Sequence, residues 1–445
     1  MKPLRRPHRP LLRSALVALP LLALFPHAQA ASQAEEDAAL DLQADAPPAP
    51  GAGTGTPAAK SWSLSTELAG VHVVGRTPWP SQDAARLAAS LRGEHAFSNA
   101  WGLRYAARLD AYSRHLDALG GATPDAYARS GALQEFYARW TPSAAASLQI
   151  GRINIREGSA FSFNPVDVYR SDSVKMFVHP SPLVTRESRQ GTFGLRGQWN
   201  YAGGSASLTY SPKLGTPDSP YTRSRAWGLD ATLTNPAHSA LAVWSHSFSD
   251  AVNAKLLAFK ASDGRWQLGS SGSALVSNAL TLHFEAAQGR MLSAQSMLGN
   301  APQTATGRQW ALGGTWTIGQ WSWTLEHAYN GLAMSGAGFA GALAGAPAGA
   351  YGYLVASERL QTLAPRRQWF LYVSRPDLFM PRLDFKAFVS QNPHDHGATF
   401  WLEARKRFTD WDLSYQWLAT TGSQRSMSGV LPARHIHQLV LSHYF

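Results

Sequence analysis

Arginine and acidic side chains recur two or four positions apart in several segments, which places them together on one face of an extended chain. Arg104, Arg108 and Asp110 show this spacing in one segment, and Asp384 and Lys386 show it in another. Guanidinium groups attract anions, and nearby carboxylates hold their side chains in order. We expect this charged face to line a water-filled space, with Arg86, Arg92, Arg104, Arg108, Asp110, Glu135, Arg139, Arg196, Arg382, Asp384, Lys386, Glu403, Arg405 and Arg407 as its lining.

A second group of charged side chains lies in the connection 154–190. Its members are Arg156, Glu157, Asp167, Arg170, Arg186, Glu187 and Arg189. A connection of 37 residues with so many charged and aromatic side chains is unusual for a surface loop. One hypothesis is a loop that folds into a pore and constricts it. The other is an external lid that its own salt bridges hold together, and the sequence leaves both open.

Four histidines could meet at one rim of such a structure. His394 and His396 flank Asp395 in a predicted outer turn, and His435 and His437 share one face near the outer end of the last segment. Imidazole and carboxylate groups suit zinc, copper or nickel. Histidines at a wet rim are more often simply solvated, so we expect no metal site and keep these four as weak candidates.

The sequence gives little support to enzyme or cofactor chemistry. Ser245 and His246 are neighbours, but neighbours on a strand point to opposite faces and cannot share the hydrogen bond that activates a nucleophile. The chain has no cysteine, so covalent haem attachment through C-x-x-C-H is excluded. We therefore expect neither an enzyme nor a bound cofactor.

The elements that carry these side chains are predicted to be membrane-spanning β-strands. In the segment 411–420, Trp411, Leu413 and Tyr415 alternate with Asp412 and Ser414. A soluble β-sandwich would show the same alternation, but its core could not bury so many charges. Tryptophans near strand ends also suit the aromatic girdles of a membrane barrel. The residues concerned are Trp310, Trp316, Trp321, Trp323, Trp401, Trp411 and Trp417.

The predicted fold is all-β, a transmembrane antiparallel β-barrel over residues 61–445. We find nineteen strand candidates, and because bacterial barrels have even strand numbers we expect 18 strands, with 16 or 20 as alternatives. Strand counts from the front and from the back of the chain disagree within 225–290, where one candidate is false or one is missed. If both ends of the barrel face the periplasm, the long connections lie outside the cell, which makes 114–130, 154–190, 331–366 and 421–434 extracellular loops. Residues 331–366 are so rich in Gly and Ala that they could form a flexible plug or a mobile flap.

The N-terminus predicts export. Basic residues precede an apolar run that ends in Ala28-Gln29-Ala30, which indicates a signal peptide over 1–30. Residues 31–60 are rich in Ala, Pro and acidic residues and predict a disordered periplasmic linker. The leader contains five of the forty Lys and Arg residues and no acidic residue, so its removal weakens any nucleic-acid interpretation of the net charge of +11.

The C-terminus carries an assembly signal. Leu439, Leu441 and Phe445 share one face of the last segment and resemble the terminal β-signal of outer-membrane barrels. His443 departs from that pattern, since an apolar or tyrosyl residue is usual there. The resemblance implies the barrel-assembly machinery as a partner, with outer-membrane lipid and lipopolysaccharide around the barrel.

The connection 154–190 also resembles a known group. Its Gly151-Arg152, Asn164-Pro165-Val166-Asp167 and Arg186-Glu187 elements are similar to those of uncharacterised porin-like barrels and, more distantly, to alginate-export porins. The resemblance implies an outer-membrane channel of a Gram-negative bacterium and no particular substrate. The leading hypothesis is passive passage of small solutes with a modest preference for anions.

Two other hypotheses stay open. The charges could pair across neighbouring strands and merely rigidify a closed interior. Alternatively, a closed or plugged barrel could act as a scaffold for a periplasmic or secreted partner in export or electron transfer.

Overall fold

The computed structural model describes residues 61–113, 129–174, 179–215, 229–295 and 303–445. The predicted signal peptide and linker, residues 1–60, lie outside the described residues, as do 114–128 of the predicted loop 114–130 and 175–178 of the connection 154–190.

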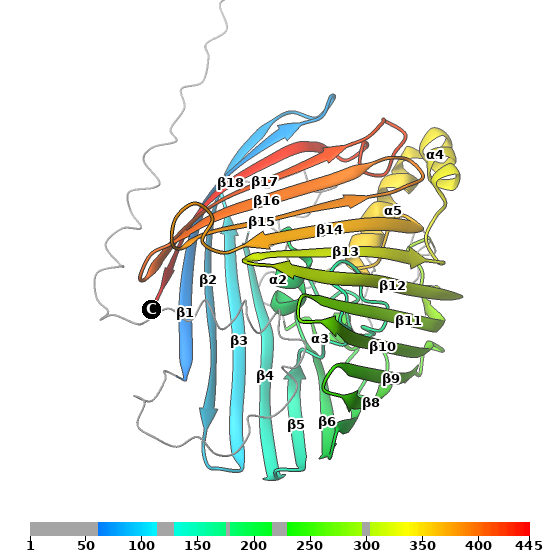
Figure 1. The fold of residues 1–445 in the computed structure, drawn as a ribbon. Helices are drawn as coiled ribbons and strands as arrows, with labels where there is room; N and C mark the ends of the chain where they lie inside the picture. Colours follow the sequence, from blue (N-terminus) through cyan, green and yellow to red (C-terminus); the bar gives the residue numbers. More distant parts are fainter. Residues whose placement is uncertain (1–60, 114–128, 175–178, 216–228, 296–302) are drawn as a thin grey trace, which may run out of the picture.

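Eighteen antiparallel strands close into one cylinder (Figure 1). Each strand pairs with its neighbours in sequence, and β18 pairs with β1 to complete the ring. The predicted fold class and strand number are therefore confirmed. The strands are β1 (Trp62–Gly75), β2 (Gln82–Ala96), β3 (Trp101–Tyr112), β4 (Arg129–Ser143), β5 (Ala146–Ile153), β6 (Thr192–Tyr201), β7 (Gly204–Ser211), β8 (Ser239–Ser249), β9 (Val252–Ala261), β10 (Trp266–Ser277), β11 (Leu280–Leu292), β12 (Thr304–Ile318), β13 (Trp321–Asn330), β14 (Arg367–Arg375), β15 (Leu383–Gln391), β16 (Ala398–Arg407), β17 (Trp411–Thr421) and β18 (Ala433–Tyr444).

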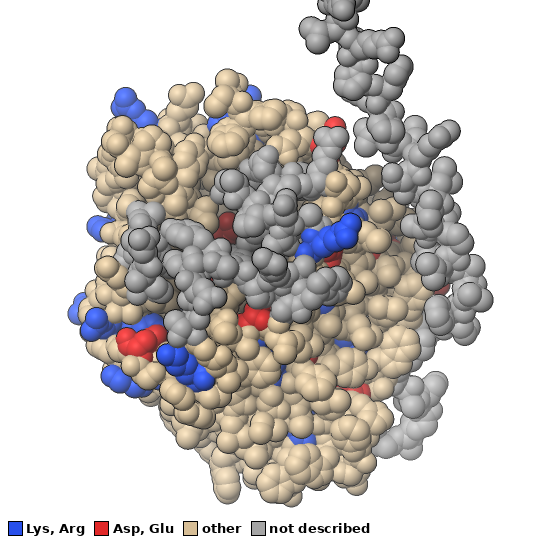
Figure 2. Space-filling model, turned by 180° about the vertical axis from the view of Figure 1, so that it is seen from behind, with Lys and Arg blue, Asp and Glu red and all other residues tan. Residues whose placement is uncertain are grey.

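The alternation of side chains gives the cylinder two different faces. On β1, Glu67 points inward to Arg86 of β2, whereas its neighbour Leu68 is 56% exposed on the outer face. Leucines from many strands are exposed in the same way, and charged side chains are sparse over most of the face shown in Figure 2. An apolar outer belt around a polar interior is the arrangement of a barrel that faces lipid.

Two expectations about individual segments were wrong. Residues 225–228 of the strand candidate 225–233 lie outside the described residues. In its described part, Asp230 adopts a left-handed backbone conformation and α3 (Ala231–Thr234) follows it, so residues 229–233 form no strand. Trp401 does not belong to an outer girdle. It points inward and is 1% exposed, because it packs on Phe388 and on the His179 ring inside the barrel.

Residues 331–366 form a helical hairpin, although their composition suggested no single conformation. It consists of α4 (Gly336–Gly345) and α5 (Pro347–Arg359), beside the ends of β13–β16 in Figure 1. The Ser335 side chain accepts a hydrogen bond from the Gly338 amide and caps α4. Phe339 and Tyr353 are fully buried in an apolar cluster with Met427. Tertiary packing therefore orders a segment whose composition favours no single secondary structure.

The remaining helix, α2 (Pro182–Ser188), belongs to the connection 154–190 and lies within the cylinder in Figure 1. No helix in the described ranges is both long enough and apolar enough to cross a membrane.

Candidate functional site

The connection between β5 and β6 reaches the inward wall of β11. The carboxylate of Glu285 accepts hydrogen bonds from the Ala160 amide at 2.7 Å and from the Asn164 side chain at 3.1 Å. Gly158 lies against the same carboxylate, with a φ of +96°. A Cβ at this position would stand 2.3 Å from Glu285 Oε1, so only glycine allows this approach.

A second carboxylate holds the next residues of the connection. Glu326 of β13 accepts hydrogen bonds from the Phe161 amide at 2.6 Å, the Ser162 amide at 2.8 Å and the Ser162 hydroxyl at 2.7 Å. The His283 Nε2 atom lies 2.7 Å from Oε1 of Glu326, the oxygen that also accepts from Phe161. Glu285 and Glu326 thus form a clamp that grips mainly backbone N–H groups, and we call this pair the carboxylate clamp.

Glycines on the wall make room for the clamped segment. A Cβ on Gly313 of β12 would come within 2.6 Å of both Glu326 and His283, and one on Gly269 of β10 would meet Val166 at 3.0 Å. The inward face of β10–β12 is therefore shaped to receive residues 158–166.

The returning arm of the connection is fixed to other strands of the barrel wall. His179 Nε2 lies 3.1 Å from the Glu403 carboxylate of β16, while its Nδ1 accepts a hydrogen bond from the Ser181 amide. The Nε2 atom therefore carries the proton and donates to Glu403. On β4, the Gln134 side chain donates to the Ser188 carbonyl at 2.6 Å.

Charged side chains also bind the connection to itself and to the wall. Asp167 and Arg189 form a buried ion pair at 2.7 Å, and Arg186 donates to the carbonyls of residues 157, 158 and 160. Arg156 pairs with Glu187 at 3.6 Å. Glu157 is 2% exposed and faces Lys255 of β9 at 3.5 Å and Arg196 of β6 at 3.9 Å. The connection thus combines its own salt bridges with anchorage to the interior.

Arg170 joins the connection to β12. It donates to the Asn164 carbonyl and, at 3.1 Å, to Gln309 of β12, and it covers the Phe163 ring. Burial lowers the pKa of Arg170 to about 10, although Asp167 and Glu285 oppose this shift. Burial also lowers the pKa of Arg186. At neutral pH Arg170 still carries its positive charge.

The helical hairpin contacts the same connection. Arg359 at the end of α5 forms an ion pair with Asp172 at 2.6 Å, and Gln361 donates to the Ser173 hydroxyl at 3.2 Å. The segments 154–190 and 331–366 are therefore joined to each other.

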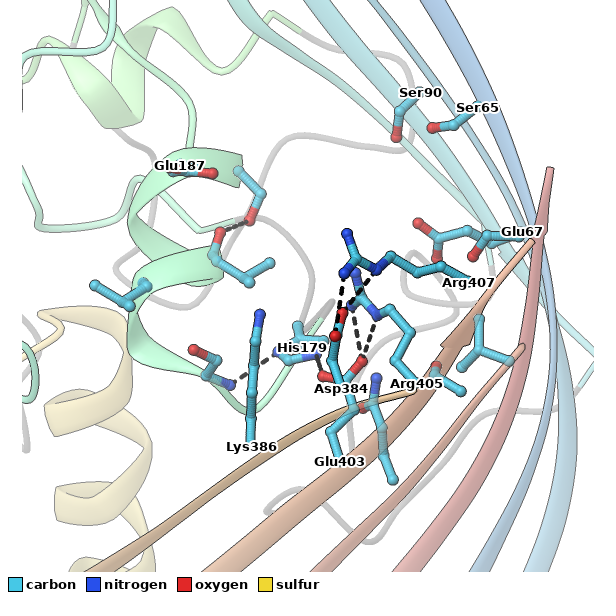
Figure 3. A pocket seen from close by; sticks show the side chains of 18 of the residues that line it. Ser65, Glu67, Ser90, His179, Glu187, Asp384, Lys386, Glu403, Arg405 and Arg407 are labelled. Atoms are coloured by element: carbon cyan, nitrogen blue, oxygen red, sulfur yellow. Dashed lines mark hydrogen bonds and ion pairs between the residues drawn. The ribbon is translucent and has the colours of Figure 1, made fainter. Parts of the chain in front are cut away.

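A cavity of about 350 Å³ lies between α2 and the wall formed by β14–β18 and β1–β4. Figure 3 shows α2 on one side and the strands on the other, with His179, Glu403 and Arg405 between them. Seven Lys and Arg side chains line the cavity against four carboxylates. These are Arg86, Arg92, Arg108, Arg375, Lys386, Arg405 and Arg407 against Glu67, Glu187, Asp384 and Glu403. The lining has an excess of positive charge.

Many of the lining cations are paired with acids on the same strand or on a strand one or two places away. Glu67 binds both Arg86 and Arg108, at 2.8 and 2.9 Å. Arg405 pairs with Glu403, and Arg407 pairs with Asp384, both at 2.7 Å. These carboxylates hold the guanidinium groups in fixed positions on the cavity wall.

The side chains predicted to face the lumen occupy inward positions of their strands, with one exception. They are Arg86 and Arg92 on β2, Arg104, Arg108 and Asp110 on β3, Glu135 and Arg139 on β4, Arg196 on β6, Asp384 and Lys386 on β15, and Glu403, Arg405 and Arg407 on β16. Arg382 instead lies in the turn before β15, with a φ of +61°, where its amide donates to Asp377. The sequence pattern placed the start of this strand at Arg382, one residue before its actual start at Leu383.

Four residues that matter here were not among the predicted site residues: Glu67, His179, Glu285 and Glu326. Three of them are inward carboxylates, and the alternation alone puts them on the polar face. Glu285 and Glu326 acquire their role only through the path of the connection, which no spacing in the sequence gives, whereas Glu67 binds Arg86 and Arg108 on the strands.

The four histidines considered for metal binding do not meet. His394 and His396 lie in a turn that Asn392 and Asp395 hold together, whereas His435 and His437 face outward on β18. In the part of the chain that the structure describes, no group of three or more His, Cys, Asp or Glu side chains could hold a metal ion.

The residues of the predicted assembly signal lie on the closing strand or just after it. Leu439 and Leu441 face outward with exposures of 53% and 39%, and the Phe445 amide donates to the Leu64 carbonyl of β1. His443 lies on the same outer face between Trp411 and Phe445.

Comparison with known proteins identifies a shared fold. No protein-family model matches the chain, and no curated protein matches its sequence. Among solved structures, OccK5 (OpdH) of Pseudomonas aeruginosa is 12% identical with a TM-score of 0.54, over 86% of this chain and 97% of that one. The outer membrane protein opdK of the same organism is 11% identical with a TM-score of 0.51, over 86% and 98%. OccAB1 of Acinetobacter baumannii is 11% identical with a TM-score of 0.54, over 86% and 96%. Over nearly the whole length of these proteins, the chain shares their fold.

Proposed function

We propose that this protein is an outer-membrane channel of a Gram-negative bacterium for the passive passage of small solutes, with a modest preference for anions. The observation that carries the proposal is the cavity inside the cylinder, bounded by α2 and by a wall with excess Lys and Arg. The apolar outer belt and the fold shared with an outer membrane protein support the location.

The connection 154–190 is the constriction in this proposal. It runs from the carboxylate clamp on β11 and β13 to Glu403 on β16 and Gln134 on β4, so it narrows the lumen. The pairing of wall charges does not argue against conduction, because the paired guanidinium groups still line the cavity. Ordered cations along a narrow passage raise the local concentration of anions.

The test is single-channel recording of the purified protein in a planar lipid bilayer, with a salt gradient that reports ion selectivity. We expect stable open steps and a reversal potential whose sign indicates that anions permeate better than cations. The double variant Arg92→Gln and Lys386→Gln neutralises two cavity cations, and it should shift the reversal potential in the direction of weaker anion selectivity.

The matched control is Lys260→Gln, which removes a positive charge from the outer face of β9. It should leave selectivity unchanged. A folded barrel that stays silent would overturn the channel proposal and favour a plugged scaffold. Equal shifts in the double variant and the control would overturn the assignment of selectivity to the cavity.

A further inference from the structure

Two histidines face each other across the seam that closes the barrel. His72 of β1 and His437 of β18 are direct cross-strand partners, and their ring centroids lie 6.2 Å apart. Both belong to the outer face, since Val71 and Val73, the neighbours of His72, are buried inside. Side chains directly opposite each other on an antiparallel pair point the same way and can bind one ligand together.

Each imidazole already has a partner on its Nδ1 atom. His72 Nδ1 lies 2.6 Å from Asp83 Oδ1 on β2, and His437 Nδ1 lies 2.8 Å from the Tyr415 hydroxyl on β17. Because β2 and β17 flank the seam on opposite sides, the two Nδ1 atoms are turned away from each other. The two nitrogens of an imidazole point to different sides of the ring, so the Nε2 atoms face the seam.

The position is open to solvent and lies at the edge of the apolar belt. The His72 side chain is 50% exposed, and a Cβ on Gly70, the next outward residue of β1, would meet nothing within 4 Å. Leu68 and Leu439 follow toward the middle of the strands, where both are more than half exposed. A small hydrated ion could therefore reach the pair from the polar side.

We propose that His72 and His437 bind a divalent transition-metal ion through their Nε2 atoms. Asp83 and Tyr415 orient the two rings from the Nδ1 side, and a carboxylate behind a ligating histidine is the usual support of such sites. Imidazole nitrogens select Cu²⁺, Ni²⁺ or Zn²⁺ over Mg²⁺ and Ca²⁺. With two protein ligands, water completes the coordination and the ion exchanges readily.

His435 is close but has another partner. Its ring lies 6.3 Å from His437 and stacks on Trp417 with an interplanar angle of 15°. The site is therefore assigned to the cross-strand pair, and it does not depend on whether the barrel conducts.

The experiment measures Cu²⁺ binding to the full chain, purified without a histidine tag and folded in detergent. We expect one Cu²⁺ per chain by isothermal titration calorimetry, with an electron paramagnetic resonance spectrum typical of nitrogen ligands. His72→Ala and His437→Ala should each weaken binding by more than about tenfold. Asp83→Asn should weaken it about tenfold, because loss of a supporting carboxylate typically costs 10- to 100-fold.

The matched control is His246→Ala, which removes an outward histidine that stacks between Trp244 and Tyr201 elsewhere on the barrel. It should bind Cu²⁺ as the unchanged protein does. Every variant must first show the heat-dependent gel shift of a folded barrel. Unchanged affinity in His72→Ala and His437→Ala would overturn the site, as would a loss seen with His435→Ala but not with His72→Ala.

Discussion

At the scale of single residues, the position of the constriction depends on a few close contacts. Gly158 combines a left-handed backbone with a carboxylate at the place where a Cβ would stand. Glu285 holds its hydrogen bonds only if the chain passes this near. The approach is therefore set by the absence of a side chain.

Replacing Gly158 by alanine should release residues 158–166 from Glu285, because the backbone strain and the steric clash add together. The measurement is trypsin cleavage of the folded protein after Arg156, Arg170 or Arg186, which we expect to become several-fold faster. Gly264→Ala is the matched control, since Gly264 has a similar φ of +88° with nothing near its Cβ position. Equal cleavage in the two variants would show that strain alone explains the effect.

At the scale of elements, the structure separates what local pattern determines from what packing determines. The strands follow from alternation, since each has a lipid-facing row and a polar row. Alternation does not determine where a strand ends. Arg382 fits the alternation of β15, but it lies in the turn before that strand. The helices α4 and α5 were not predicted, because their Gly and Ala content favours no structure until Phe339 and Tyr353 are buried.

The candidate site was predictable only in part for a related reason. Its wall residues are fixed by strand phase, but the contacts of the carboxylate clamp with the connection join residues more than a hundred positions apart, such as Ala160 and Glu285. The histidine pair is similar. His437 was noted as a rim residue, whereas its partner His72 follows from the register of β1 on β18.

The hold of β13 on the connection can be tested with Glu326→Gln. The amide replaces an acceptor oxygen by a donor and faces the N–H groups of Phe161 and Ser162, so local stability should fall by about 1–3 kcal/mol. Hydrogen exchange of the residue 161 and 162 amides should accelerate about tenfold or more. Glu135→Gln, which affects an inward carboxylate paired with Arg104, should leave this exchange unchanged. Slow exchange retained in Glu326→Gln would contradict the clamp.

At the scale of the whole molecule, stability comes from a ladder without a free edge. The chain has no disulfide to close it, and the pairing of β18 with β1 satisfies the backbone groups that would otherwise face lipid. Adjacent strand residues meet opposite environments, because the outer belt favours apolar side chains and the lumen favours polar ones.

Leu439 and Gln438 on β18 allow a direct comparison of these demands. Leu439→Arg places a charge in the apolar belt and should cost about 2–4 kcal/mol near the middle of the membrane. Gln438→Arg places the same side chain toward Gln416 in the lumen and should cost much less. Urea unfolding in lipid vesicles measures both. Similar losses at the two positions would contradict the assignment of lipid and lumen faces.

The carboxylate clamp also bears on how such a barrel can diversify. Glu285 and Glu326 grip the backbone N–H groups of residues 160, 161 and 162, and every amino acid except proline supplies that group. The amide hydrogen bonds therefore do not depend on the side chains, whereas the buried Ala160 and Phe161 and the Ser162 hydroxyl, which also donates to Glu326, limit the side chains that fit here. Diversification of this stretch is therefore confined to side chains that fit the same buried space, on a scaffold that keeps its hold on the backbone.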